Sequence, residues 1–174
     1  MVVFVPVGVP PHREIEQDPG AEVRVQLCDY AVAADARFAL SRIEVDREGL
    51  SYTADTLRAV GEWSPDDELV LILGADQAAA LPEWHEPEAV LELATVAVVA
   101  REGLEREAVL RRLERLAGHE RIEFFDMPRI DISSSLVRER AAAGRPIRYL
   151  VPDKVANYIG AKSLYASSTP VPAE

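Results

Sequence analysis

The sequence predicts an α/β domain with a mostly parallel sheet. Apolar runs of five or six residues, rich in Val, Ile and Leu, alternate along the chain with longer segments of helical periodicity. This alternation is typical of βαβ units, whose strands run parallel and are buried on both faces. Ligands of such sheets bind beyond the carboxyl ends of the strands. Gly8, Gly74, Arg101 and residues 130–133 each follow an expected strand, so we look for a site among them.

One domain accounts for nearly the whole chain. Its 174 residues, 48% of them hydrophobic, can build one sizeable core. We expect the domain to cover residues 1–165, and the Ser-, Thr- and Pro-rich residues 166–174 to form a flexible tail.

The expected strands are short and mostly continuous in their apolar character. Buried strands are predicted at residues 2–7 and 69–73, a further strand of the parallel type at 95–100, a strand at 121–125, and a weaker, alternating strand at 37–45.

The expected helices lie between these strands, at residues 21–34, 53–63, 87–93, 104–117, 133–143 and 152–159. The segment 104–117 is the clearest amphipathic helix, and its spacing places Leu104, Ala108, Leu110 or Leu113, and Ala117 inward. Arg111, Arg112 and Arg115 alternate with acidic residues, which favours a solvated face over a polyphosphate site.

The composition excludes several function classes. With 19 basic and 30 acidic residues the net charge is −11, which argues against a nucleic-acid or anionic membrane surface. The lone Cys28 excludes an intramolecular disulfide and a multi-cysteine metal site, and we expect it to be a buried thiol. Neither a run of membrane-spanning length nor a signal peptide is visible, so we expect a cytoplasmic protein.

Residues 130–138 (Ile-Asp-Ile-Ser-Ser-Ser-Leu-Val-Arg) are the most informative stretch, because they lead from a strand into a helix. The first N–H groups of a helix are unpaired and lie at the positive end of its dipole, so they attract anions. Ser133, Ser134 and Ser135 can add hydroxyl donors, and Arg138 adds a planar fork suited to phosphate oxygens. The alternative is a Ser-rich helix start that serves only as an N-cap.

A second candidate follows the strand at residues 69–73. Gly74 would allow a nucleotide to approach the backbone closely, and Asp76 would accept a hydrogen bond from it. The alternative is a glycine turn with Asp76 capping the next helix. Trp84 offers a flat face for stacking or packs over a helix. Its neighbour His85 has no partners at metal-ligand spacing, and we interpret it as structural or surface.

These motifs, in this order, resemble those of the bacterial nicotinate-nucleotide adenylyltransferases. Residues 132–138 and 144–152 resemble the family's Ile-Ser-Ser-Thr-x-Ile-Arg and Gly-x-x-x-x-x-Leu-x-Pro patterns. The further matches are residues 2–13 (second strand and Pro-Pro-His loop), 51–57 (Ser-Tyr-Thr-x-Asp-Thr-Leu), 71–76 (strand and Gly-x-Asp turn) and 81–85 (Trp loop).

The chain also departs from the family pattern. The family's opening strand and its Gly-Gly-Thr-Phe-Asp-Pro-x-His-x-Gly-His segment have no counterpart here, so His12, His85 and His119 do not match the catalytic histidine pair. Either the natural protein begins upstream of Met1, which we favour, or the chain is a degenerate remnant. Without that central strand, the edges of its two neighbours should be exposed. Ser135 replaces a threonine, and Arg101-Glu102-Gly103 replaces Arg-Pro-Gly.

The resemblance implies a Rossmann-like nucleotidyltransferase fold that lacks its first strand and helix. It implies adenylyl transfer from ATP to nicotinate mononucleotide, giving deamido-NAD and pyrophosphate, with Mg²⁺ bridging the triphosphate. ATP would be held by Gly74, Asp76, Ser133, Ser134 and Arg138. The mononucleotide would be held by Gly8, His12, Arg13, Thr53, Trp84 and Arg101, where Thr53 could equally be an N-cap. No catalytic residue and no metal-ligand cluster is assigned.

Two alternatives stay open. A sister adenylyl- or cytidylyltransferase acting on another phosphate would share the fold and the serine-rich helix. A non-catalytic nucleotide-binding domain would bind ATP or deamido-NAD without turnover. This chain would behave in the same way if the missing histidines leave it inactive. The sequence fixes neither a homo-oligomeric state nor the preference for the acid over the amide mononucleotide.

Overall fold

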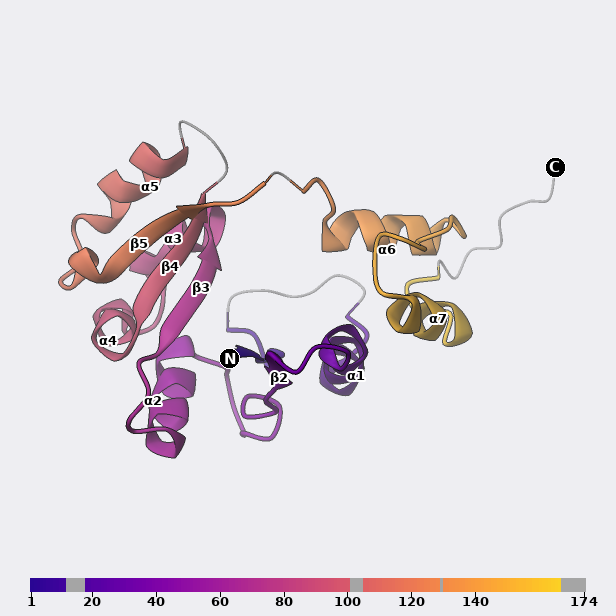
Figure 1. Cartoon of the computed structure of the whole chain (residues 1–174), viewed down its shortest axis with the longest axis horizontal. Coiled ribbons are helices and arrows are strands. Elements are labelled where there is room, and N and C mark those ends of the chain that lie inside the picture. Colours follow the sequence, from indigo (N-terminus) through magenta and orange to yellow (C-terminus); the bar gives the residue numbers. More distant parts are fainter. Residues whose placement is uncertain (12–17, 101–104, 129, 167–174) are drawn as a thin grey trace. The chain divides into compact units, whose positions relative to one another are not determined.

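The computed structural model describes residues 1–11, 18–100, 105–128 and 130–166 (Figure 1). The chain forms two compact units, each of which we describe by itself. The first unit contains Met1–Ser51 together with Asp131–Glu174, and the second contains Tyr52–Ile130.

A three-stranded parallel sheet organises the second unit. Its strands are β3 (Val70–Gly74), β4 (Thr95–Ala100) and β5 (Ile122–Asp126), in the order β3-β4-β5. Val96 of the central strand lies opposite Leu71 on one side and Ile122 on the other. Val96 and Val98, which share one face of β4, are fully buried, whereas Ala97 and Val99 on its other face are half-buried.

Within its described residues, the second unit also contains four helices and two short 3₁₀ turns. They are α2 (Thr53–Trp63), α3 (Ala75–Ala80), α4 (Pro87–Leu93), α5 (Glu105–Leu113) and the turns Leu81–Glu83 and His119–Arg121. The predicted bounds of α2 and α4 are confirmed. An acidic residue in the first turn of α2 and Pro87 at the start of α4 favour these starting points. The short α3 was not predicted from the sequence.

The predicted inward face of α5 is correct at Leu113 and wrong at Ala108 and Ala117, and Leu104 lies outside the described residues. Val109 and Leu113 of this helix, with Leu116 just beyond it, are buried in the core, whereas Ala108 and Ala117 are exposed. The larger apolar side chains decide the rotation of the helix, because burying them removes more apolar surface from water than burying alanine does.

The predicted complete burial of β3 is also wrong. Leu71 and Leu73 pack against the core, but Val70 and Ile72 are 56% and 51% exposed. Among the described residues β3 pairs on one side only, with β4. Its alternating burial shows separately that one face of the strand is covered and the other is exposed.

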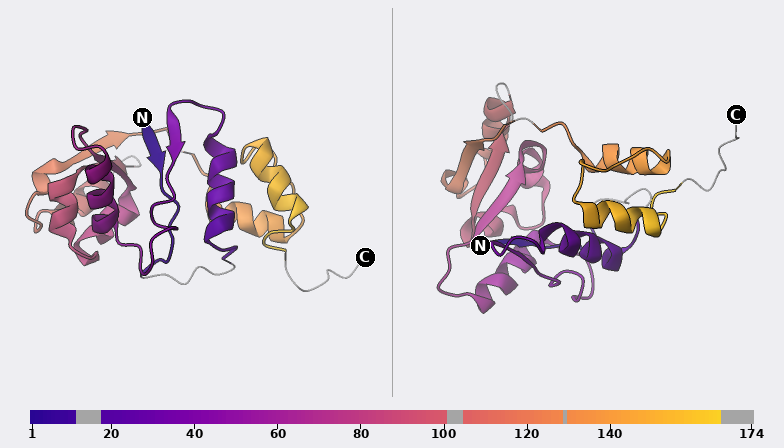
Figure 2. Two further views of the ribbon diagram at one scale, coloured as in Figure 1. Left: turned by 90° about the horizontal axis from the view of Figure 1, so that it is seen from below. Right: turned by 45° about the vertical axis from the view of Figure 1, so that its right-hand side comes forward.

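The first unit combines a two-stranded parallel sheet with three helices. Its elements are β1 (Val2–Phe4), α1 (Ala21–Val32), β2 (Phe38–Leu40), α6 (Ser134–Ala142) and α7 (Asp153–Ala161). Helices α1 and α7 lie against one another, with the Tyr30 and Tyr158 rings edge to face at 5.4 Å between centroids (Figure 2). The second core forms between α6 and α7, around Val137, Ile147, Val155 and Ile159.

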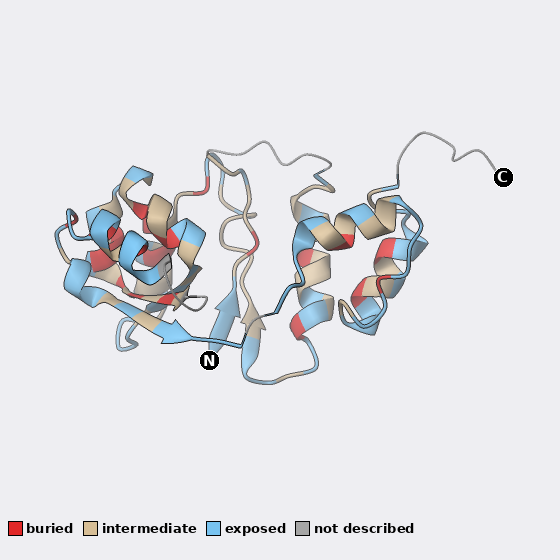
Figure 3. Cartoon of the chain, turned by 90° about the horizontal axis from the view of Figure 1, so that it is seen from above, coloured by how far each residue is buried: buried red, intermediate tan, exposed pale blue. Residues whose placement is uncertain are grey.

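The prediction of a buried strand over residues 2–7 is wrong in length and in burial. Only Val2–Phe4 is a strand, and all three residues are exposed (Figure 3). The strand predicted at 37–45 shrinks to β2, which is the only strand paired with β1 in the described part of the chain. Cys28 is half-buried rather than buried.

The α/β class with parallel sheets is confirmed. Gly144 ends α6 with a φ of 64°, which agrees with the predicted glycine stop. A search of the described residues finds no helix with the length and apolar character needed to cross a membrane.

Candidate functional site

The start of α6 has the geometry that its serines predict. Ser133 is the N-cap, and its Oγ accepts a hydrogen bond from the Leu136 N–H at 3.1 Å. The capping interpretation is therefore correct for this hydroxyl. Because a cap of this kind satisfies one N–H group, it leaves the neighbouring helix amides for an anion.

The next two serines and Arg138 lie in the same pocket. Arg138 donates from Nη2 to the Ser135 Oγ at 3.2 Å, so its planar group is held over the first turn of α6. The pocket has a volume of about 640 Å³ and includes Ser133, Ser134, Ser135 and Arg138. The structure thus brings together the predicted phosphate-binding group of the first unit.

Arg24 and Asp18 line the same pocket and were not predicted from the sequence. They form an ion pair, and the hydrogen bond from Arg24 lowers the pKa of the Asp18 carboxyl. Arg24 reaches the pocket from α1, about 110 positions away from Arg138 in sequence, and such long-range pairing leaves no local signal.

Two further pocket residues remain neutral at pH 7. Burial raises the pKa of the Cys28 thiol and that of the Tyr165 phenol. The charge in this pocket therefore comes from Arg24, Arg138 and Asp18.

Gly74 and Asp76 lie in the second unit, at the carboxyl end of β3. Gly74 is the N-cap of α3, with a φ of −74° that suits any residue. A Cβ at this position would meet nothing within 4 Å. Neither backbone conformation nor packing within the protein therefore requires a glycine here.

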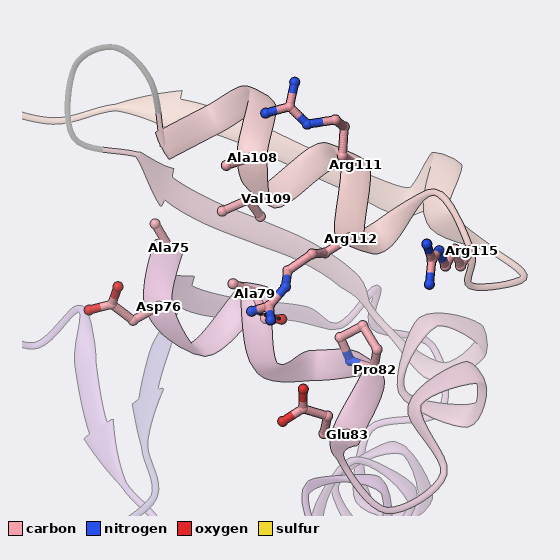
Figure 4. Close-up of a pocket in the computed structure, with 10 residues that line it drawn as sticks. All are labelled: Ala75, Asp76, Ala79, Pro82, Glu83, Ala108, Val109, Arg111, Arg112 and Arg115. Atoms are coloured by element: carbon pink, nitrogen blue, oxygen red, sulfur yellow. Dashed lines mark hydrogen bonds between the residues drawn. The ribbon is translucent and has the colours of Figure 1, made fainter.

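Asp76 is not the cap of α3 but lies in its first turn. It lines a pocket of about 730 Å³ between α3 and α5 (Figure 4). Arg111, Arg112 and Arg115 line the opposite wall, and Arg112 donates weakly to the Ala79 carbonyl at 3.5 Å. All three arginines are exposed, as predicted for a solvated face.

The tryptophan loop of the second unit is held by α2. Trp84 is half-buried against the core, and the neighbouring His85 ring lies 4.2 Å from the Tyr52 ring, centroid to centroid. Arg58 binds Glu86 at 2.6 Å. These contacts fix the loop on the same helix start that carries Thr53, and they assign His85 a structural role. The N-cap of α2 is Tyr52, so Thr53 is the first helical residue and not the cap.

Three predicted site residues, His12, Arg13 and Arg101, lie outside the described residues. Gly8 is described, and its backbone is held within the first unit by Arg24 and Ser51. Within the described ranges, no group of three His, Cys, Asp or Glu side chains could hold a metal ion.

The parallel α/β fold, the residues at the start of α6 and those at the end of β3 are features of one class of protein, the nucleotidyltransferases. Residues 1–140 match the family model described as cytidylyltransferase-like, which groups nucleotidyltransferases on a Rossmann-like fold. A solved structure of nicotinic acid mononucleotide adenylyltransferase from Plasmodium falciparum, complexed with NaAD, has the same fold. It superimposes with a TM-score of 0.71 at 16% identity, covering 94% of this chain and 81% of that one.

Relatives at higher identity specify the family. The probable nicotinate-nucleotide adenylyltransferase of Geobacillus thermodenitrificans is 41% identical over 168 residues, which are 97% of this chain and 73% of the relative. The nicotinate-nucleotide adenylyltransferase of Bacillus subtilis is 34% identical over 164 residues, 94% of this chain and 82% of the relative. The chain belongs to the nicotinate-nucleotide adenylyltransferase family.

Proposed function

We propose that this protein transfers the adenylyl group of ATP to nicotinate mononucleotide, in the synthesis of NAD. The observation that carries the proposal is the α6 start, where Ser133 caps the helix and Arg138 is held over Ser135 beside the open pocket. Family membership specifies the substrates that such a phosphate-binding helix would serve.

The reaction makes modest chemical demands on the protein. A phosphate oxygen of the mononucleotide attacks the α-phosphorus of ATP, a new P–O–P bridge forms, and the bond to the β-phosphate breaks to release pyrophosphate. Because the nucleophile is already an anion, no strong base is needed. The protein has to align two polyanions in line and stabilise the charge that develops.

The proposal assigns different parts of ATP to two groups of residues. In the proposal, phosphate oxygens are bound by the α6 amides, Ser133, Ser134 and Arg138. Helix N–H groups and a guanidinium are suited to this because both stabilise a negatively charged phosphate. Gly74 and Asp76 would bind the nucleoside part. The open space at Gly74 supports this role, because a ligand that approaches the backbone closely would explain a glycine that nothing in the protein requires.

The mononucleotide would be held by residues around the tryptophan loop and the loop after β1. Trp84 would stack on the pyridine ring, and the contacts of the next two residues, His85 with Tyr52 and Glu86 with Arg58, support a preformed loop. Thr53, Gly8, His12, Arg13 and Arg101 would complete this half of the site.

Mg²⁺ would enter as part of the co-substrate MgATP. The described residues offer no cluster of three metal ligands, which suits a cation held mainly by triphosphate oxygens and water. A cytoplasmic location stays a prediction, and so does assembly into homo-oligomers.

The test is pyrophosphate release with ATP and one acceptor at a time: nicotinate mononucleotide, nicotinamide mononucleotide, or another phosphate monoester. Nicotinate mononucleotide should give pyrophosphate and deamido-NAD in equal amounts. Faster release with another phosphate acceptor would point to a sister transferase. Binding of ATP and mononucleotide without any release would identify a non-catalytic domain.

A further inference from the structure

A carboxylate lines the pocket that is proposed to bind phosphate groups. Asp18 belongs to the lining of this pocket together with Arg24, Ser134 and Arg138. In a pocket of about 640 Å³ charges act across the cavity, because salt screens them only over about 10 Å. Since like charges repel, a negative side chain at this place works against the binding of a phosphate.

The charge of the pocket depends on Asp18. In the described part of the chain, three charged side chains line it: Arg24, Arg138 and Asp18. Two positive charges and one negative charge sum to +1, and loss of the carboxylate would raise the sum to +2. Cys28 and Tyr165 contribute no charge at pH 7, because burial raises the pKa of both.

Asp18 is held in the pocket as an ionised group. Its Oδ1 accepts a hydrogen bond from the Gly20 N–H at 3.0 Å and pairs with the Arg24 guanidinium. The hydrogen bond from Arg24 lowers the pKa of the carboxyl, so Asp18 is negative at pH 7. Because the side chain lines the pocket and is 34% exposed, a bound ligand would face this charge.

Arg24 is held in place independently of Asp18. Its Nη2 donates to the carbonyl oxygens of Val7 and Gly8 at 2.8 and 2.9 Å, and only 17% of its side chain is exposed. Arginine also stays protonated at any ordinary pH. Removing the charge of Asp18 would therefore leave the guanidinium where it is, and the positive charge of the pocket would rise.

We infer that Asp18 limits the affinity of this pocket for phosphate groups and thereby favours the release of pyrophosphate. The inference rests on the proposed function, which forms one pyrophosphate in each turnover. Pyrophosphate carries no nucleoside, so the charges and donors around its phosphates decide how long it stays bound. A pocket with two uncompensated arginines would hold this product longer, and product release limits turnover in many enzymes.

The test measures the Kd of inorganic pyrophosphate by titration calorimetry, in the presence of Mg²⁺ and at low salt. Asp18→Asn removes the charge but keeps an oxygen that can accept from the Gly20 N–H. Asp18→Ser is a second neutral variant, and Asp18→Glu keeps the negative charge.

Asp35→Asn is the matched control. Asp35 also accepts a hydrogen bond from a backbone N–H two residues on, at 3.0 Å, and it also pairs with an arginine, Arg37. Its side chain is 33% exposed, close to the value for Asp18, but it does not line the pocket. Both substitutions change the net charge of the protein equally, so a difference between them reports the position of the charge.

The neutral variants should bind pyrophosphate more tightly. Asp18→Asn and Asp18→Ser should lower its Kd by about three- to tenfold, as expected for one unit charge acting over several ångströms near a protein surface. Asp18→Glu and Asp35→Asn should stay within about twofold of wild type. The difference between Asp18→Asn and wild type should shrink when salt is raised to about 0.5 M, because ions screen the carboxylate. A merely structural effect of the substitution would not follow the salt concentration in this way.

Two further measurements separate the inference from the proposed function. Failure of the wild type to form deamido-NAD would refute the proposed function, and the inference with it. Arg138→Gln should raise the Kd of pyrophosphate by about tenfold, and an unchanged value would show that pyrophosphate binds elsewhere, which overturns both. If Arg138→Gln weakens binding but Asp18→Asn leaves the Kd unchanged or raises it, the inference alone is wrong. An equal effect of Asp35→Asn would also overturn it, because the net charge of the protein would then set the affinity.

Discussion

The substitution Gly8→Ala should destabilise the protein far more than the same change at Gly74. At Gly8 the added carbon would lie 2.1 Å from the Glu44 carbonyl oxygen and 2.8 Å from its carbonyl carbon. These are backbone atoms, so no side-chain rotation relieves the overlap. At Gly74 the added carbon would meet nothing within 4 Å, and the φ of −74° is ordinary for alanine.

The magnitude follows from the contacts that must shift. Overpacking of this kind costs about 1–3 kcal/mol. Moving residue 8 away from residue 44 would also weaken the two hydrogen bonds to the Ser51 Oγ, each contributing about 0.5–1.5 kcal/mol. We therefore expect a loss of about 3 kcal/mol for Gly8→Ala, and a change within about 1 kcal/mol for Gly74→Ala, where only the preference of the N-cap position for glycine over alanine is lost.

The assay is urea unfolding of wild type and both variants, monitored by tryptophan fluorescence and by circular dichroism. Two probes are needed because the chain forms two units that could unfold separately. A Gly8→Ala protein as stable as wild type, or a Gly74→Ala protein that loses more than about 2 kcal/mol, would refute the reasoning from Cβ contacts.

Four further predictions follow from the same structure. Gly74→Ala, though nearly neutral for stability, should raise KM for ATP, and an unchanged value would remove Gly74 from the proposed nucleotide site. Ser133→Ala should cost about 1 kcal/mol in unfolding free energy through loss of the α6 cap, whereas Ser134→Ala should cost little and affect only ATP binding. Leu113→Ala, at a 1% exposed position, should cost about 2–5 kcal/mol, and a smaller loss than for the half-buried Leu110→Ala would contradict the observed rotation of α5. The hydrogen bond from Arg24 lowers the pKa of the Asp18 carboxyl, so this ion pair stabilises the protein above the ordinary carboxyl pKa, and the stabilisation is lost as pH falls through the folded-state value. When the free energy of unfolding is measured at decreasing pH, it should therefore fall less steeply for Asp18→Asn than for wild type.

The sequence predicted those elements that carry their own local signals. Pro87 at a helix start, Ser133 as a cap and Gly144 at a helix end each fix a boundary through their own backbone chemistry. The bounds predicted for β4 were correct, because a continuous apolar run is typical of a central parallel strand.

The predictions were wrong where the burial of a residue depends on the elements packed around it. A continuous apolar run does not reveal whether both faces of a strand are covered. The strand β1 is exposed, and β3 is exposed on the face of Val70 and Ile72. The prediction for α5 was correct at Leu113 but missed Val109, because Ala108 and Ala117 were counted equally with larger apolar side chains. The α3 helix has only six residues, four of them alanine, and therefore shows no amphipathic period.

The residues of the candidate site also divide into those that could be predicted from the sequence and those that could not. Ser133, Ser134 and Arg138 stand within one helical turn and a half, so their grouping could be predicted. Arg24, Asp18 and Ser51 were missed because their contacts join residues 6 to 43 positions apart, and each is an ordinary residue in its own segment. Only the folded chain brings Arg24 and Ser51 together at the backbone of Gly8.

The most direct test of the proposed activity is product formation by the purified protein. ATP, Mg²⁺ and nicotinate mononucleotide are incubated with it, and deamido-NAD and pyrophosphate are measured together, with nicotinamide mononucleotide as the comparison acceptor. Equal amounts of both products, formed only when a pyridine mononucleotide is present, are the predicted result. Saturable ATP binding with neither product, or pyrophosphate release that ignores the mononucleotide, would contradict the assignment.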